Sequence, residues 1–191
     1  MRHPILLAPL ACLVLAVGCH TASEMLLLSK FYLSPDGHES VGSVVSPDFI
    51  AHQRFILRER SRVSAVEVYV NYQCSTVAPL MYIYSDKNNK PDSLVAQLYC
   101  TDEANERGWV RYVSANRILL PSNRYWIAIG FSKNQLARLL PDSSFQLTWY
   151  GSRGSPYTGE NDALSYKISQ AEWISQDSDL FFRVLGSQVT E

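Results

Sequence analysis

Few side chains in this sequence have the types and spacing that catalysis requires. His20, His38 and His52 are the histidines beyond an apolar N-terminal segment, and none stands at a spacing typical of zinc sites. The sequence also lacks a glycine-rich phosphate loop and a Gly-x-Ser-x-Gly nucleophile motif. Glu160 and Asp162 are close enough in sequence for acid–base chemistry, but acidic loops are usually just solvated. We therefore expect no enzyme, no metal site and no cofactor, and a hydrolase using these carboxylates alone is the least favoured alternative.

The N-terminal segment has the features of an export signal. Arg2 and His3 precede an apolar run from Ile5 to Val17, which is followed by small residues and a cysteine. A transmembrane helix needs about 20 predominantly apolar residues, and this run is shorter. We expect residues 1–18 to be removed as a signal peptide.

Leu15-Ala16-Val17-Gly18-Cys19 resembles the lipobox of bacterial lipoproteins, although lipoproteins more often carry leucine where Ala16 stands. The resemblance implies a mature chain that begins at Cys19, carries a diacylglycerol and palmitate-type acyl chains there, and is anchored to a membrane. With His20 next, it implies sorting to the outer membrane of a Gram-negative host. Ordinary cleavage after Ala16-Val17-Gly18 remains an alternative.

The number of remaining cysteines also supports acylation of Cys19. Cys12 leaves with the signal, so Cys19, Cys74 and Cys100 remain, and an odd thiol is unusual in an oxidising compartment. Acylation of Cys19 would leave one pair. Cys74 and Cys100 both continue the apolar alternation of the segments before them, and we predict a Cys74–Cys100 disulfide. A free or intermolecular Cys19 and a reactive or metal-binding cysteine pair are the alternatives.

The elements that position these residues are predicted to be strands. Apolar side chains recur at every second position, as in Val66, Val68 and Val70, which is the pattern of half-buried strands. The expected strands are residues 53–58, 66–70, 80–85, 94–100, 109–114, 125–131, 145–150, 164–168 and 180–185. Short strands at regular spacing indicate an all-β antiparallel β-sandwich or barrel. We expect one short helix over 133–140, turn-rich stretches at 85–93 and 151–162, an anchor and N-terminal segment over 19–50, and a β-sandwich domain over 51–191.

Four short motifs carry a resemblance to a fold. They are Tyr82–Asp86, Lys90–Leu94, Gly108–Val110 and Tyr125–Ala128. Together they resemble the jelly-roll β-sandwich domains of secreted and surface-anchored bacterial proteins. The resemblance covers roughly residues 53–185, and it implies a jelly-roll-like antiparallel sandwich in a group that includes sugar-binding members.

Aromatic residues and one loop are the most suggestive binding features. We expect four aromatic residues to lie opposite the most apolar face of their strands, so that some of them could form an exposed platform for sugar rings or peptides: Tyr69, Tyr84, Trp126 and Tyr150. Packing against the core is the favoured alternative. The following loop carries polar and aromatic side chains suited to recognition. The tentative ligand-binding residues are Trp126, Tyr150, Arg153, Tyr157, Glu160 and Asp162.

Charge excludes one class of partner. Seventeen basic and 18 acidic residues leave the chain near neutral, so nothing indicates nucleic-acid binding. Arg54, Arg58, Arg60 and Arg62 could touch anionic headgroups, although Glu59 and the strand pattern favour a solvated face. The sequence favours a non-catalytic, membrane-anchored lipoprotein that binds a glycan or cell-envelope polysaccharide. The alternative is a protein-interaction lipoprotein: an assembly partner, an inhibitor, an immunity factor or an exclusion factor.

Overall fold

Antiparallel strands make up most of the residues that the computed structural model describes, which are 24–30, 41–73, 78–101, 107–139, 146–152, 163–176 and 178–189. The strands are β1 (Met25–Lys30), β2 (Val41–Val45), β3 (Phe49–Leu57), β4 (Ser61–Gln73), β5 (Leu80–Lys87), β6 (Lys90–Cys100), β7 (Gly108–Leu120), β8 (Asn123–Gly130), β9 (Gln146–Ser152), β10 (Ala163–Lys167), β11 (Glu172–Gln176), β12 (Asp179–Leu180) and β13 (Phe182–Gln188). One α-helix, α1 (Lys133–Leu139), and one 3-10 turn, Ile168–Gln170, complete the described residues. The expected all-β, antiparallel, sandwich-like fold is confirmed.

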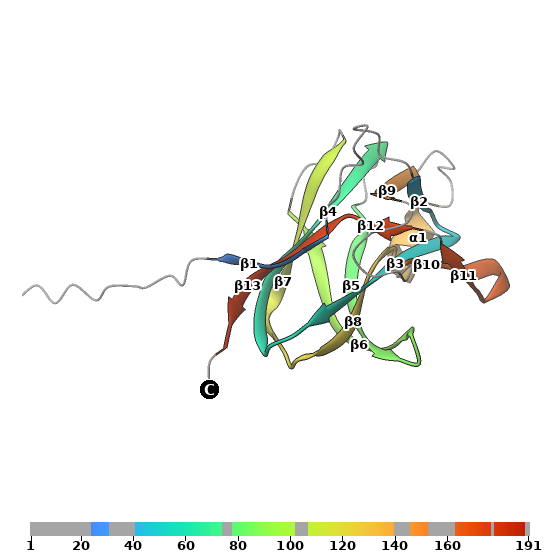
Figure 1. Ribbon diagram of the computed structural model, residues 1–191. Coiled ribbons are helices and arrows are strands. Elements are labelled where there is room, and N and C mark those ends of the chain that lie inside the picture. Colours follow the sequence, from blue (N-terminus) through green and yellow to red (C-terminus); the bar gives the residue numbers. More distant parts are fainter. Residues whose placement is uncertain are drawn as a thin grey trace, which may run out of the picture.

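The strands follow one hydrogen-bonded path that curls back on itself (Figure 1). Its order is β1-β13-β4-β7-β6-β5-β8-β3-β10-β11, and β9 joins it by pairing with β2, β4 and β12. We call the half with β1, β13, β4, β7, β9, β2 and β12 the β4 sheet, and the half with β6, β5, β8, β3, β10 and β11 the β8 sheet. β6 joins them, because it pairs with β5 along its length but with β7 only through Tyr99 and Cys100.

A single apolar core lies between the two sheets. Valines 66, 68 and 70 of β4 pack in the same buried cluster as Ile127 and Ile129 of β8. One polar side chain is built into this core with both of its functional groups satisfied. The side-chain oxygen of Gln53 accepts a hydrogen bond from the Leu180 backbone N–H at 2.7 Å, and its side-chain NH₂ donates to the Arg54 backbone carbonyl at 3.0 Å. Gln53 therefore ties β12 of one sheet to β3 of the other.

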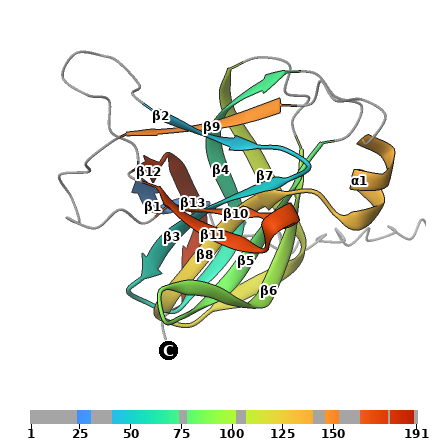
Figure 2. The same ribbon diagram turned by 90° about the vertical axis from the view of Figure 1, so that its right-hand side faces the viewer.

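The sheets extend upstream of the expected boundary at residue 51. β1 pairs with β13, and β2 pairs with β9 (Figure 2). β1, β2 and β11 are strands for which the sequence pattern raised no expectation. Within the described residues, no helix has the length and apolar character needed to cross a bilayer.

Two local signals explain where elements start and turn. Ser132 and Gln135 form a reciprocal cap at the start of α1, with hydrogen bonds of 3.2 and 2.8 Å, so the helix begins at Lys133 as expected. The stretch 85–93, expected to be turn-rich, is mostly strand. Its turn is only Asn88 and Asn89, whose φ angles of 56° and 59° suit a two-residue hairpin that asparagine tolerates.

Candidate functional site

Three aromatic rings gather on the outer surface of the β4 sheet, and we call this group the aromatic face. It consists of Tyr69 in β4, Trp109 in β7 and Tyr150 in β9, all half-buried. Tyr69 and Trp109 are direct cross-strand partners, with ring centroids 5.5 Å apart and planes at 60°. The Tyr69 and Tyr150 rings are 6.0 Å apart. Edge-to-face and tilted contacts at these distances are favourable for aromatic pairs.

A change of strand partner brings Tyr150 beside Tyr69. β4 pairs with β13 up to Val68 and with β9 from Val70 onward. Phe181 fills the junction, because its carbonyl accepts a hydrogen bond from the Tyr69 amide at 3.3 Å and its amide donates to the Tyr150 carbonyl at 2.9 Å. The buried Trp149 indole also donates to the Phe181 carbonyl, at 2.8 Å. The aromatic face thus stands on a rigid, hydrogen-bonded junction.

Two arginines lie over the rings. The guanidinium carbon of Arg107 is 4.4 Å from the centroid of Tyr150 and 5.8 Å from that of Tyr69. The guanidinium carbon of Arg183 is 3.9 Å from the Trp109 ring. These are cation–π distances, so each guanidinium group stabilises the position of the ring that it covers.

A row of charged groups continues across the same surface. Glu67 of β4 forms ion pairs with Arg111 at 3.2 Å and with Arg183 at 3.5 Å. Arg111 also donates to Glu24, and this hydrogen bond holds the pKa of Glu24 below its usual value and raises the pKa of Arg111. Apolar rings and both kinds of charge therefore adjoin one another on the outer surface of the β4 sheet.

The structure separates the two strand residues expected to bind a ligand. Tyr150 belongs to the aromatic face, whereas Trp126 lies on the outer surface of the other sheet, where only 2% of it is exposed. The Trp126 indole donates to a carboxylate oxygen of Asp86 at 2.7 Å, and the guanidinium carbon of Arg54 is 5.8 Å from its ring. Trp126 is thus covered by its neighbours.

Other expected residues lie outside the described part of the chain. These are Cys19, Cys74, Arg153, Tyr157, Glu160 and Asp162. Cys100 ends β6, is half-buried and packs against the core, which is the side that its strand alternation predicts. The Cys74–Cys100 disulfide stays a prediction.

Sequence reasoning missed Trp109, Arg107 and Arg183 as site residues, although a signal for two of them exists. Trp109 precedes the buried Val110, and Arg183 stands between the buried Phe182 and Val184. Alternation alone therefore places both side chains outward. The sequence could not predict that β7, β13 and β9 all pair with β4 around Val68–Val70, which brings these side chains together.

Titratable groups in the described residues add no catalytic arrangement. His52 is buried, and this burial lowers its pKa to about 4, so the imidazole is neutral. No three His, Cys, Asp or Glu side chains among the residues described here are grouped to hold a metal ion.

The chain was compared with known protein families and with curated proteins. No family model matches it, and no curated protein is significantly similar to it.

Proposed function

We propose that this protein is a lipid-anchored, non-catalytic binding protein whose domain recognises a glycan of the cell envelope through the aromatic face. The observation that carries the proposal is the group of Tyr69, Trp109 and Tyr150 with two arginines over the rings. Tilted rings offer apolar surfaces to the C–H faces of sugars. Arginine donors and the Glu67 carboxylate suit hydroxyl and carboxylate groups at the edge of a sugar ring.

The segment that follows β9 belongs to the proposal through its position in the sequence, where a turn-rich stretch is expected. Arg153, Tyr157, Glu160 and Asp162 come within twelve residues of Tyr150. Polar and aromatic side chains on loops beside a rigid sheet often contribute to recognition. The resemblance of four short motifs to jelly-roll domains, a group that includes sugar-binding members, supports the same function.

Anchorage is the second part of the proposal. The signal segment, the lipobox-like motif and the odd number of exported cysteines support acylation of Cys19 and localisation to the cell envelope, with the outer membrane favoured in a Gram-negative host. Metabolic labelling with a palmitate analogue tests this part. We expect label in the wild-type chain and none in Cys19→Ala; label that survives this substitution would exclude Cys19 as the attachment site.

Glycan recognition is tested by screening the protein on a glycan array and titrating the best ligand while recording tryptophan fluorescence. Trp109→Ala and Tyr150→Ala should each weaken binding about tenfold or more, since each removes a stacking surface. Tyr99→Ala is the matched control, because Tyr99 is 48% exposed but lies on β6. Equal losses in all three variants, or no bound glycan on the array, would contradict the proposal.

A protein partner is the second candidate, and β6 is the observation that favours it. In the described strands β6 pairs with β7 only through Tyr99 and Cys100, so its preceding residues offer an edge on that side. Leu94 and Val95 there are 56% and 43% exposed. Open edges with apolar side chains accept partner strands. A photo-crosslinker at position 95 that captures a protein in native membranes, with none captured from position 109, would favour this candidate over a glycan.

A further inference from the structure

Five arginines gather at the end of the sandwich where β3 turns into β4. Arg58, Arg60 and Arg62 come from this turn and the start of β4, and Arg117 and Arg124 come from the adjoining ends of β7 and β8; all five are exposed. Strand register brings them together, because Arg62 pairs with Leu119 and Arg124 pairs with Ile56. Glu59 is the one acidic residue in the turn 58–60. The adjoining β5–β6 hairpin adds two lysines and two aspartates, which leaves the positive excess unchanged.

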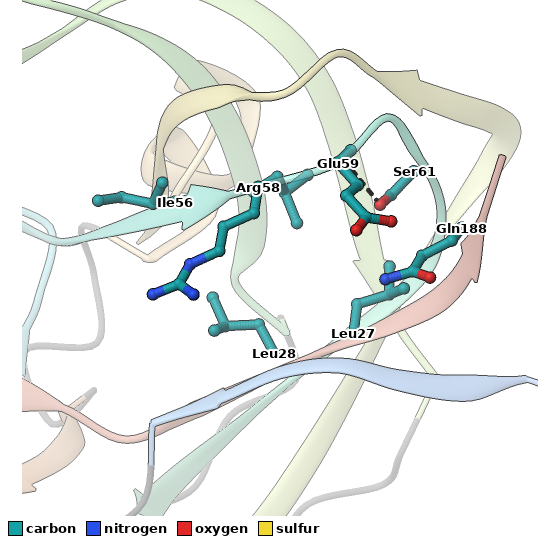
Figure 3. A pocket seen from close by; sticks show the side chains of 8 residues that line it. Leu27, Leu28, Ile56, Arg58, Glu59, Ser61 and Gln188 are labelled. Atoms are coloured by element: carbon teal, nitrogen blue, oxygen red, sulfur yellow. Dashed lines mark hydrogen bonds between the residues drawn. The ribbon is translucent and has the colours of Figure 1, made fainter. Parts of the chain in front are cut away.

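Apolar side chains are exposed among these arginines. Leu26 is 51% exposed, Ile56 49% and Leu119 44%. Leu28, Ile56 and Arg58 surround a hollow of about 320 Å³ beside β1 (Figure 3). Arginine next to exposed leucine and isoleucine is the composition of surfaces that sit at a lipid headgroup layer.

The chain enters the domain at this same end. Met25 at the start of β1 pairs with Gly186, which pairs with Val63 near the β3–β4 turn. Glu24 is five residues from Cys19, a reach of at most roughly 18 Å when extended. Given the proposed anchor at Cys19, on which this step rests, the arginine-rich end is the part of the domain that the anchor holds nearest to the bilayer.

We propose that the arginine-rich end docks onto the anionic phospholipid headgroups of a bilayer. The arginines bind lipid phosphates, and Leu26, Ile56 and Leu119 enter the headgroup layer. Tyr69 lies eight residues along β4 from Ser61, roughly 25 Å at the rise of a strand. Docking therefore fixes the orientation of the domain and holds the aromatic face away from the lipid.

Co-sedimentation of the full chain with phosphatidylcholine vesicles, with and without phosphatidylglycerol, tests this docking. The apolar N-terminal segment contributes to binding on both kinds of vesicle, so the difference between them measures docking. We expect tighter binding to the anionic vesicles, and a loss of about thirtyfold on those vesicles for Arg58→Ser/Arg60→Ser, because each basic side chain near such a surface contributes about a fivefold factor.

Lys133→Ser/Lys167→Ser is the matched control. It removes the same charge at the opposite end, since Lys133 begins the helix after β8 and Lys167 pairs with Phe49 at the start of β3. Equal binding of the wild type to both vesicles, or equal losses in the two variants, would overturn the proposal. Binding to these vesicles requires neither a glycan nor an acyl chain on Cys19. A protein that does not bind them through the arginine-rich end could therefore still bind a glycan or be labelled with palmitate.

Discussion

The two sheets carry aromatic residues on both of their outer surfaces, but individual side chains among the described residues are buried to different extents. On the β4 sheet, Tyr69, Trp109 and Tyr150 are half-buried, with arginines over their rings. On the β8 sheet, Trp126 is enclosed, and His52 is buried with the Trp173 ring 4.9 Å away. We call the group formed by Trp126 and His52 the covered face; the aromatic residues around it are half-buried, like the rings of the aromatic face: Tyr82, Tyr84, Tyr166 and Trp173. Alternation decides which surface a side chain is on, but neighbouring segments decide whether it is exposed.

The β5–β6 hairpin and β11 make the difference. Asn89 in that hairpin accepts a hydrogen bond from Arg54 at 2.6 Å, and Asp86 accepts one from Trp126. Trp173 on β11 packs against Tyr166 and His52. Trp126 and His52 thus form a second small core, whereas each of the three rings of the aromatic face is half-buried.

Trp126→Ala is the change expected to have the largest effect. Removing this enclosed ring leaves a cavity and leaves Asp86 without the indole N–H, so we expect a loss of about 3–5 kcal/mol in the free energy of unfolding. Urea denaturation followed by circular dichroism measures it.

Trp109→Ala on the aromatic face is the comparison variant. Its ring is half-buried and its cross-strand pair with Tyr69 contributes modestly, so the expected loss is about 1 kcal/mol. If Trp126→Ala and Trp109→Ala lose equal free energy of unfolding, the distinction between the covered face and the aromatic face is wrong.

The covered face should also lose stability in acid. His52 has a pKa of about 4 in the folded protein against 6.5 unfolded, so the unfolded state binds the proton more readily. Its contribution is present above pH 6.5 and is lost as the pH falls toward 4. Between about pH 7.5 and pH 4.5, we expect a loss of about 2.5 kcal/mol from this group.

His52→Leu isolates that contribution. Carboxylates such as Glu24, whose pKa is lowered, also cost stability in acid, but they titrate alike in both proteins. The pH-dependent loss in denaturation experiments should therefore be smaller in His52→Leu by about 2.5 kcal/mol. Parallel pH profiles would mean that water reaches the imidazole and that the face is not closed.

Strand alternation predicted the fold well where apolar and polar residues alternate over many positions. The runs around Val66 and Ile127 are strands, as expected, and the sandwich-like arrangement follows from them. Short edge strands such as β2 and β11 were not predicted, because their alternation of apolar and polar residues spans few positions. The turn expected within 85–93 is shorter than predicted, because Asn88 and Asn89 in left-handed conformation form a two-residue turn without the glycine that usually marks such hairpins.

Of the three rings and two arginines in the described candidate site, only two rings were expected to face outward from the sequence. Tyr69 and Tyr150 were expected to face outward and do so in one group, but Trp126, expected with them, is on the other sheet. The alternation of apolar residues cannot predict which sheet a strand joins, since that depends on pairing between residues such as Val70 and Trp149, far apart in sequence. It also cannot predict that the β5–β6 hairpin covers the Trp126 ring.

Glu67→Gln, next to the aromatic face, is expected to change the free energy of unfolding least. Glu67 is paired with two arginines whose side chains are 33% and 36% exposed, and water screens such pairs. The amide keeps the shape and can still accept a hydrogen bond, so we expect less than about 1 kcal/mol of lost stability in urea denaturation, and less still at high salt. A loss above about 2 kcal/mol, insensitive to salt, would mean that Glu67 holds the sheet together. The charged row would then be structural, and the aromatic face would have less freedom to exchange its own contacts for those of a ligand.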